Sequence, residues 1–349
     1  MKALFVGLGS IGQRHLRNLR RILPEIEVLA VRYARNSPAL TDTNEVLPEN
    51  DLQRHYNLTE IESLEEALSL KPELVFVTNP SSLHCTVAMK ALNAGAYIFI
   101  EKPISDSWDG INDLLNHANS KKRIYVGFQY RFHPALNLIN SLIQENVIGN
   151  LVGARLMNGE YMPGWHPYED YRNSYAARKE LGGGALVTQI HDFDYAIWLL
   201  GMPKLISAVG GHLSSLEVDV EDSVQILMNT PHNGRNLPVS ISLDYLHWPP
   251  KRGITIVGED GTICCDLVKN IVILNNRLTQ SSETYNFEQF DRNQMFIDEL
   301  KNFLDFAAGK ADPAVDLNDG LKSLQVALAA KKALITDSVI AINEDTNES

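Results

Sequence analysis

The sequence predicts an α/β domain with a doubly wound parallel sheet, followed by an α+β domain with a mainly antiparallel sheet. Three observations support this prediction. The chain has 349 residues, which is near the upper limit for one hydrophobic core and favours two domains. In the first third, short apolar runs alternate with helical patterns, as in parallel sheets covered by helices on both faces. Later in the chain, strand-like runs follow one another without intervening helices, which indicates antiparallel pairing.

Four apolar runs in the first third have the pattern of buried strands. They are ALFVG at 3–7, EVLAV at 27–31, LVFVT at 74–78 and YIFI at 97–100. Helical patterns separate them, and one begins at Ser63, where Glu66 completes a capping box. Ser81 or Ser82 is expected to cap the next helix. We therefore predict a first domain over residues 1–125.

The predicted second domain covers residues 126–320. A long helical pattern at about 183–200 precedes six strand-like runs separated by Gly, Pro, Asn and Asp. These runs lie near 205–211, 223–230, 238–246, 252–257, 262–268 and 271–274. Two more helical patterns follow. The last is rich in alanine, and we expect residues 321–349 to form a helix that returns toward the first domain, plus a polar tail.

The composition excludes several classes of function. The formal net charge is −12, so we expect neither a nucleic-acid surface nor an anionic membrane surface, because both need a basic face. No apolar run is long enough to span a bilayer, and the first residues lack the pattern of a secretion signal. The three cysteines are an odd number and two are adjacent, which argues against a disulfide framework. These features predict a cytoplasmic protein.

The motif GLGSIG has the glycine spacing G-x-G-x-x-G between the first strand and the first helix. In this context the spacing is typical of the dinucleotide-binding turn of a Rossmann domain. Glycine lets the backbone approach the pyrophosphate, and the first amides of the helix are expected to hold it. The predicted ligands are Gly7, Gly9, Ser10, Ile11 and Gly12.

The position that selects the cofactor ribose holds an unusual residue. An acidic residue about 20 positions after the glycines normally binds the ribose 2′-hydroxyls of NAD, but here the residue is Arg32. Arg32, with Arg35 and Ser37 nearby, is suited to bind a 2′-phosphate. The alternative is that these arginines only solvate a loop. The sequence thus predicts NADP as the cofactor, with NAD as the alternative.

Glu101, Lys102 and Pro103 follow the last buried strand of the first domain. Ligands of open parallel sheets bind beyond the carboxyl ends of the strands, so Lys102 is expected to face the crevice that holds the nicotinamide. Its ammonium can hydrogen-bond a substrate hydroxyl or carbonyl and stabilise alkoxide charge, while Glu101 holds or tunes it. A lysine on a solvated loop is the alternative, and the triplet alone does not decide between them.

The segment 159–184 between the domains is dense in Trp, Tyr, His and Arg. Aromatic faces stack on sugar rings and arginines bind phosphates or carboxylates, so we interpret the segment as a substrate-binding surface, with an incidental loop as the alternative. The predicted substrate ligands include Tyr161, Trp165 and Arg172, together with Arg131 in QYRFHP. The histidines lack the spacing of a metal site, and no metal is predicted.

Five motifs follow one another along the chain: GLGSIGQRH, TNPSSLHC, IEKPIS, GFQYRFHP and GGGALVTQIHDFDYAIWLLG. In this order they resemble the signatures of the Gfo/Idh/MocA family, which includes glucose-fructose oxidoreductase and inositol dehydrogenase. The resemblance covers almost the whole chain. It implies a large open sheet in the second domain, a nicotinamide cofactor and a sugar or polyol substrate. It also implies that Lys102 and His191 are catalytic and that Asn79, Pro80 and His84 lie near the nicotinamide.

The chain departs from the family pattern before the histidine. Many members have an aspartate three or four residues before it, where this chain has Thr188 and Val187. Thr188 is instead predicted to contact substrate. Asp194 lies one helical turn after His191, so we expect it to share a helix face with His191 and to orient the imidazole.

Together these features predict an NADP-dependent dehydrogenase or reductase that acts on a carbon–oxygen bond of a sugar, sugar acid or sugar nucleotide. The alternatives are a redox-assisted glycosidase, an imine or enone reductase, and a non-catalytic dinucleotide sensor. Arg155, Arg172 and Arg178 favour an anionic sugar, unless they pair with acidic residues of their own segment. An antiparallel sheet with one helix-free face must be covered, which predicts a homodimer or homotetramer.

Overall fold

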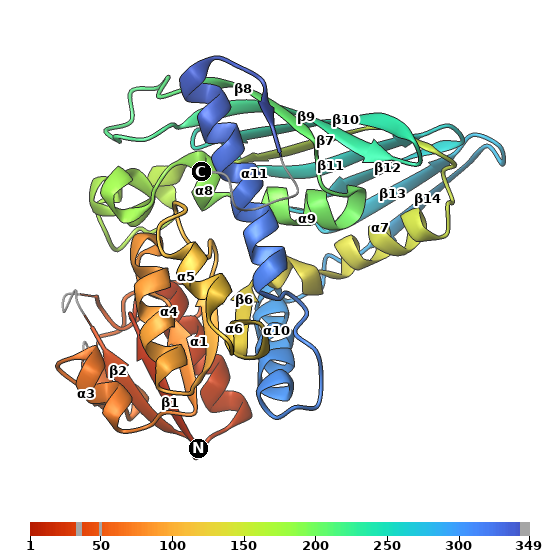
Figure 1. The fold of residues 1–349 in the computed structure, drawn as a ribbon. Coiled ribbons are helices and arrows are strands. Elements are labelled where there is room, and N and C mark those ends of the chain that lie inside the picture. The colour runs from red at the N-terminus through yellow and green to blue at the C-terminus, as the bar shows by residue number, and fades with distance from the viewer. Residues whose placement is uncertain (33–36, 49–50, 343–349) are drawn as a thin grey trace.

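The computed structural model describes residues 1–32, 37–48 and 51–342, and two sheets organise this part of the chain (Figure 1). The first is a six-stranded parallel sheet in the order β3-β2-β1-β4-β5-β6. The second has nine strands in the order β14-β13-β12-β11-β7-β10-β9-β8-β15. In the second sheet β7 and β10 pair in parallel, while the other neighbours are antiparallel. Both predicted domain classes are confirmed.

Strands and helices alternate in the first domain. Its strands are β1 (Lys2–Val6), β2 (Glu27–Val31), β3 (Thr59–Glu60), β4 (Leu74–Val77), β5 (Tyr97–Glu101) and β6 (Ile124–Gly127). Its helices are α1 (Ser10–Ile22), α2 (Leu52–Tyr56), α3 (Leu64–Ser69), α4 (His84–Asn93), α5 (Ile111–Asn116) and α6 (Ser120–Arg123), with a 3₁₀ turn η1 (Ser81–Leu83). The four predicted strands are confirmed to within one residue at each end. Ser63 caps α3 as predicted, but Ser81 and Ser82 lie in η1 and do not cap α4.

The second domain begins after β6. Its strands are β7 (Leu151–Gly159), β8 (Leu205–Gly211), β9 (Ser223–His232), β10 (Arg235–Asp244), β11 (Lys251–Gly258), β12 (Gly261–Asp266), β13 (Ile271–Asn276), β14 (Ser281–Asn286) and β15 (Ile340–Ala341). Its helices are α7 (Pro134–Gln144), α8 (Ala185–Thr188), α9 (His191–Leu200), α10 (Arg292–Ala307) and α11 (Leu317–Thr336). Short 3₁₀ turns are η2 (Gln129–Phe132), η3 (Met162–Gly164), η4 (Tyr171–Asn173), η5 (Tyr175–Ala177) and η6 (Lys179–Leu181). The six predicted strand-like runs correspond to β8 through β13, whereas β7, β14 and β15 were not predicted.

Helix α10, which comes late in the chain, packs against α1 of the first domain and lies beside that domain in Figure 1. Its residues Leu300, Phe303 and Phe306 join the apolar cluster that includes Phe76 and Phe99 on one face of the parallel sheet. The alanine-rich helix α11, expected to return toward that domain, lies mainly along β8 and α9 and also contacts β6 and α6 of the first domain. Its first turns reach β6. None of the helices in the described ranges is long and apolar enough to cross a membrane.

The helical pattern predicted at 183–200 is interrupted in the structure. α8 ends at Thr188 and α9 begins at His191. In a continuous helix the backbone N–H of Asp192 would donate to the carbonyl of Thr188, but it donates instead to the carbonyl of Gln189 at 3.2 Å. The break therefore leaves the Thr188 carbonyl available to another donor.

Candidate active site

The glycine-rich turn between β1 and α1 has the geometry of an anion-binding site. Gly7 has φ +98°, and a Cβ atom there would lie 2.8 Å from the backbone nitrogen of Asn79. A Cβ atom at Gly12 would lie 2.5 Å from the carbonyl oxygen of Gly7. At Gly9, in contrast, it would meet no described atom within 4 Å, and no described side chain caps α1. The first amides of α1, including those of Ser10 and Ile11, are thus available to a diphosphate.

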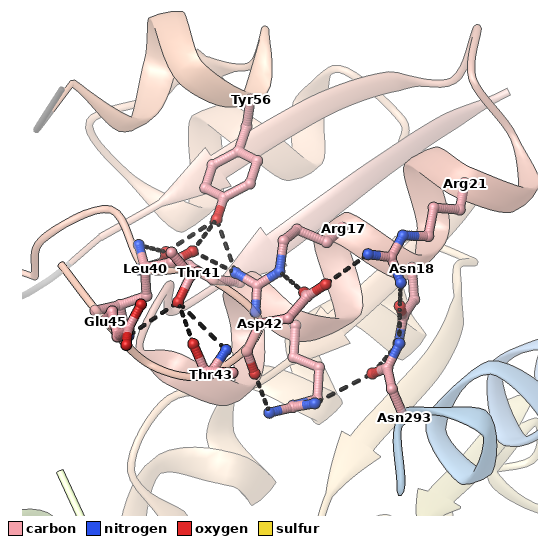
Figure 2. A network of polar contacts seen from close by, with 12 residues as sticks. Arg17, Asn18, Arg21, Leu40, Thr41, Asp42, Thr43, Glu45, Tyr56 and Asn293 are labelled. Atoms are coloured by element: carbon pink, nitrogen blue, oxygen red, sulfur yellow. Dashed lines mark hydrogen bonds and ion pairs between the residues drawn. The ribbon is translucent and has the colours of Figure 1, made fainter. Parts of the chain in front are cut away.

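A polar network holds the segment after β2 against α1 (Figure 2). Arg17 Nε and Arg21 Nη2 each lie 2.6 Å from the Asp42 carboxylate. Nearby, Gln13 Oε1 accepts the backbone N–H of Leu40 at 2.9 Å. These contacts hold the segment around residues 40–42 against α1, the helix that follows the glycine-rich turn.

Arg32 lies directly after β2, as its predicted role in cofactor binding requires. Its guanidinium is not isolated, because Nη1 pairs with Glu60 at 2.6 Å and Nη2 donates to the carbonyl of Ser37 at 3.3 Å. Arg35 lies outside the described residues. The position at which NAD-binding Rossmann domains normally have an acidic residue therefore holds Arg32, and the carboxylate of Glu60 on β3 lies beside it.

Lys102 extends from the end of β5 toward the second domain. Its Nζ donates to the carbonyl oxygen of Thr188 at 3.0 Å, and the Lys102–Pro103 peptide bond is cis. Burial lowers the pKa of Lys102 to about 8, with the charge of Glu101 opposing this shift and that of Arg252 adding to it. An amine with this pKa exchanges a proton readily near neutral pH.

Glu101 does not hold the Lys102 ammonium through any described hydrogen bond. One carboxylate oxygen lies 2.6 Å from Nε2 of His15 on α1, and the other accepts the backbone N–H of Lys102 at 3.1 Å. The Glu101 carboxylate therefore acts on the lysine through its charge and through a hydrogen bond from the Lys102 backbone N–H. Sequence reasoning missed His15, although its place one turn after Gly12 puts it on the buried face of α1.

His191 is the first residue of α9 and is buried. Its Nε2 lies 3.3 Å from Gln129 Nε2, while Nδ1 is buried and finds no partner within the described ranges. Burial, followed by the charge of Lys102, lowers the pKa of His191 well below its ordinary value. The imidazole is therefore neutral at physiological pH and has one nitrogen available for a ligand.

Asp194 does not orient His191, contrary to the sequence prediction. Its carboxylate forms two hydrogen bonds with Arg131, of 2.8 and 2.9 Å, and accepts a third from Ser323 at 3.4 Å. Arg131 also lies over the Trp198 ring, 5.0 Å from its centroid. Because a buried carboxylate needs a cation, this pair stabilises α9, and the contacts do not support the predicted substrate role of Arg131.

A second buried ion pair lies behind His191 and was missed by sequence reasoning. Asp192 accepts hydrogen bonds from Arg252 at 2.6 Å and from Asn158 at 2.9 Å. The Arg252 guanidinium lies 4.4 Å from the centroid of the Tyr130 ring, which is 5.0 Å from the His191 ring. The network therefore supports the histidine through an aromatic contact.

The residues after β4 lie next to the glycine-rich turn. Both polar atoms of the Asn79 side chain are buried without a hydrogen-bond partner in the part of the chain that the structure describes. His84 lies with its ring nitrogens 2.8 Å from the carbonyls of Asn79 and Pro103. His84 thus connects the turn after β4 to the turn after β5, while Pro80 precedes η1.

The segment 159–184 reaches from the second domain to the first. The Ser81 hydroxyl donates to the carbonyl of Gly182 at 3.3 Å. At Tyr168, burial raises the pKa of the phenol and the Ser10 hydroxyl, hydrogen-bonded to it, opposes the rise. Trp165 packs on Tyr245 with ring centroids 5.1 Å apart. The segment therefore touches the starts of both α1 and η1.

The arginines of this segment are already paired. Arg172 is exposed and lies 2.7 Å from Asp170 and 3.0 Å from Glu217, and Arg178 lies 4.0 Å from Asp219. Tyr161 is 42% exposed. Arg172 is therefore not available to an anionic substrate in this arrangement, which is the alternative that the sequence left open.

Several buried polar atoms on the elements that carry the candidate site residues lack partners among the described residues. They are the amide of Asn79, Nε1 of Trp165, Nδ1 of His166 and Nδ1 of His191. Leaving such a group unpaired costs about 1–3 kcal/mol, so native proteins pair nearly all of them. A bound dinucleotide and a polyhydroxy substrate would supply the missing donors and acceptors, so the residues present fit a nicotinamide cofactor.

Comparison with known proteins identifies the family. The model "Oxidoreductase family, NAD-binding Rossmann fold" matches residues 1–128, and the "GFO/IDH/MocA C-terminal domain" matches residues 137–264. An uncharacterized oxidoreductase of Synechocystis sp. is 31% identical over 173 residues, which cover 48% of this chain and 44% of that protein. The myo-inositol 2-dehydrogenase of Thermotoga maritima is 24% identical and covers 99% of both chains.

Solved structures share the whole fold. The WlbA dehydrogenase of Bordetella pertussis, in complex with NADH and UDP-GlcNAcA, has a TM-score of 0.78 and 21% identity over 99% of each chain. A levoglucosan dehydrogenase bound to NADH and levoglucosan has a TM-score of 0.80 and 17% identity, covering 99% of this chain and 100% of its own. On the family models and the motifs of this site, the chain belongs to the Gfo/Idh/MocA family of oxidoreductases.

Proposed function

We propose that the protein is a nicotinamide-dependent dehydrogenase or reductase that acts on a carbon–oxygen bond of a sugar, sugar acid or sugar nucleotide. The observation that carries this proposal is the meeting of Lys102 and His191 from two domains. Lys102 Nζ bonds the carbonyl of Thr188, three residues before His191. The relatives named for inositol and the neighbours bound to NADH support the same class of reaction.

The chemistry follows from the protonation states of these two residues. When bound, a nicotinamide would supply the acceptor or donor of the hydride. During oxidation Lys102, as a neutral amine, accepts the proton of the substrate hydroxyl, and during reduction its ammonium returns that proton and stabilises the oxygen. Neutral His191 hydrogen-bonds the same oxygen or its neighbour, while Trp165 offers an aromatic face to the sugar ring.

For the cofactor we propose a preference for NADP(H) over NAD(H). Arg32 at the ribose position supports it, because a guanidinium attracts a 2′-phosphate that a carboxylate would repel. Glu60, 2.6 Å from Arg32, weakens this attraction by neutralising part of the charge. The preference is therefore expected to be moderate.

For assembly we propose a homodimer or homotetramer that pairs through the nine-stranded sheet. Side chains along β9 alternate between buried and exposed, and the exposed face carries large apolar side chains. These include Leu205, Val209 and Leu227, which are 40%, 63% and 54% exposed. A second subunit would remove this apolar surface from water. The cysteines are free thiols, which supports the proposed cytoplasmic location.

The test is a substrate panel followed by nicotinamide absorbance. Neutral polyols, free hexoses, sugar acids and uridine-diphosphate sugars are each offered with oxidised and with reduced cofactor. For at least one class of substrate, one cofactor should be oxidised or reduced for each substrate molecule converted. A glycosidase would consume substrate with no net change in cofactor absorbance, and a sensor would bind cofactor without turnover.

A further inference from the structure

Arg292 has no partner among the described residues, and its charge acts on both Lys102 and His191. It is the first residue of α10 and is exposed. Within residues 1–32, 37–48 and 51–342, no hydrogen bond or ion pair engages its guanidinium. Arg131 and Arg252, which also border the site, are instead bound to the buried carboxylates of Asp194 and Asp192.

The residue that follows Arg292 holds the start of α10 against α1. The side-chain amides of Asn293 and Asn18 bond each other at 2.9 and 3.2 Å (Figure 2). Arg14 donates to Asn293 Oδ1 at 3.1 Å. Arg14 lies one helical turn after Ser10 on α1, so it lies on the same face as the start of that helix. The same helix α10 packs against η2, where Gln129 contacts His191.

The guanidinium of Arg14 has no ion-pair partner among the described residues, although the charges of Asp42 and Asp291 act on it. Arg14 donates to neutral acceptors, the side-chain carbonyl of Asn293 and the backbone carbonyl of Asp42. Burial, followed by the charge of Arg292, lowers the pKa of Arg14 to about 10. The charge of Arg292 also lowers the pKa values of Lys102 and His191.

Two carboxylates lie close to this cluster but are committed elsewhere. Asp42 is held between Arg17 and Arg21, and Asp291 accepts the backbone N–H of Asn293 at 2.9 Å as the cap of α10. Arg14 and Arg292 therefore repel each other, in a chain with net charge −12, without a directly bound carboxylate among the described residues. Such arrangements are typical of sites that bind an anion.

We propose that Arg292, supported by Arg14, binds an anionic oxygen of a ligand at the proposed active site. This oxygen belongs to a phosphate or a carboxylate group. A guanidinium suits both groups because it donates two parallel hydrogen bonds. The inference rests on the proposed function and gives Arg292 the role that the sequence suggested for Arg172. The anion has two possible sources, the diphosphate of the cofactor or an anionic group on the sugar.

The test compares Arg292→Gln with Arg235→Gln, a matched control in which an exposed arginine paired with Glu259 is removed from β10. Dissociation constants are measured by titration calorimetry for NADPH and for ADP-ribose, which keeps the diphosphate but lacks the nicotinamide. Steady-state KM is then measured at saturating cofactor for a sugar acid, a uridine-diphosphate sugar and a neutral polyol.

A weakening of about tenfold or more for one anion, seen in Arg292→Gln and absent in Arg235→Gln, is expected. Weaker binding of both NADPH and ADP-ribose assigns the anion to the cofactor. A higher KM for the anionic sugars alone assigns it to the substrate. All constants within twofold of the unmutated protein would overturn the inference. If the unmutated protein binds no dinucleotide, the proposed function fails instead.

Thermal unfolding supplies a control for folding. Arg292→Gln should melt at the same or a higher temperature than the unmutated protein without ligand, since it relieves repulsion with Arg14. Inorganic diphosphate or the anionic sugar should raise the melting temperature of the unmutated protein more than that of Arg292→Gln. Equal shifts in both proteins would contradict a role for Arg292 in anion binding.

Discussion

The Nζ of Lys102 lies 3.0 Å from the carbonyl oxygen of Thr188, and this hydrogen bond joins the two domains at the proposed active site. The carbonyl is available because the helix stops there and Asp192 donates to Gln189 instead. The break between α8 and α9 therefore gives the lysine a fixed position and brings it close to His191.

Replacing Lys102 by Met should abolish hydride transfer while the cofactor dissociation constant stays within a few-fold. Methionine matches the unbranched stem of lysine but lacks the ammonium and its charged hydrogen bond. Losing such a bond in a dry site costs about 2.7–4 kcal/mol, or a hundredfold or more in rate. Single-turnover absorbance with the best substrate of the panel measures this loss. Lys301→Met, an exposed lysine on α10, is the control. Near-normal turnover in Lys102→Met would eliminate the lysine as a catalytic group.

The two reaction directions should respond oppositely to pH. Oxidation needs the neutral amine, so kcat/KM should rise as pH passes the Lys102 pKa of about 8. Reduction needs the ammonium, so its rate should fall over the same interval. His191 stays neutral in this range because its pKa is well below the ordinary value. If the rates of oxidation and reduction both rose, or both fell, with increasing pH, this assignment of Lys102 would be contradicted.

Cofactor preference should respond to both members of the Arg32–Glu60 pair. Arg32→Asp should reverse the preference toward NADH, because a carboxylate repels the 2′-phosphate and accepts the ribose hydroxyls. Glu60→Gln should strengthen NADPH binding, because it removes the charge 2.6 Å from the guanidinium. The ratio of the two dissociation constants is the measurement. Equal affinities for NADPH and NADH in the unmutated protein would refute the proposed preference.

Glu299 on α10 should limit stability at high pH. It is 1% exposed, and neither carboxylate oxygen has a partner in the described part of the chain. Burial, followed by the charge of Glu101, raises its pKa well above the ordinary value. The folded state therefore keeps a proton that the unfolded state loses above a pH of about 4.3. The free energy of unfolding then falls by about 1.4 kcal/mol per pH unit until the folded pKa is reached.

Glu299→Gln removes this titration while keeping the shape of the side chain. The variant should gain stability over the unmutated protein, and the gain should grow between about pH 5 and pH 7, within which this titration acts. Urea unfolding at both pH values measures the difference, with the exposed Glu288→Gln as the control. A gain that stays constant or shrinks as pH rises would show that Glu299 is ionised in the folded protein.

The exposed face of the nine-stranded sheet should control assembly. Leu227→Lys places a charge in the middle of the proposed interface, where desolvating it is unfavourable. Sedimentation at micromolar concentration should show a smaller species for this variant than for the unmutated protein. Leu213→Lys, which changes a 69% exposed residue outside the strands, should leave the mass unchanged. A monomeric unmutated protein would refute the proposed assembly.

Local patterns predicted much of the fold and the cofactor turn. The strands of the first domain are buried on both faces, so they appear as continuous apolar runs. Gly7 and Gly12 are needed because a Cβ atom would clash with nearby backbone, and such constraints appear directly in the spacing of glycines. The prediction that Lys102 lies at the ligand-binding edge of the sheet followed from its position directly after β5, because parallel strands end at the same edge.

The side-chain partners within the site could not be predicted in this way. Arg252 meets Asp192 across 60 residues of sequence, and His15 meets Glu101 across 86. Helical spacing predicted that Asp194 lies beside His191 and orients it. The Asp194 carboxylate instead forms two hydrogen bonds with Arg131, which lies in η2. No local pattern indicates which of two nearby groups a carboxylate will bind. Sequence reasoning overlooked Arg292 for a related reason. Its proposed role in anion binding depends on its having no partner among the described residues, which the sequence does not reveal.

Deuterium transfer tests the central claim most directly. The unmutated protein is incubated with nicotinamide cofactor that carries deuterium at the transferred position and with the oxidised form of the best sugar in the panel. The account predicts that mass spectrometry and proton spectra find one deuterium on the carbon that bears the new hydroxyl. Lys102→Met should form at least about a hundredfold less of this product in the same time. Product formed without deuterium, or with no net oxidation of the cofactor, would contradict hydride transfer between the nicotinamide and the substrate carbon.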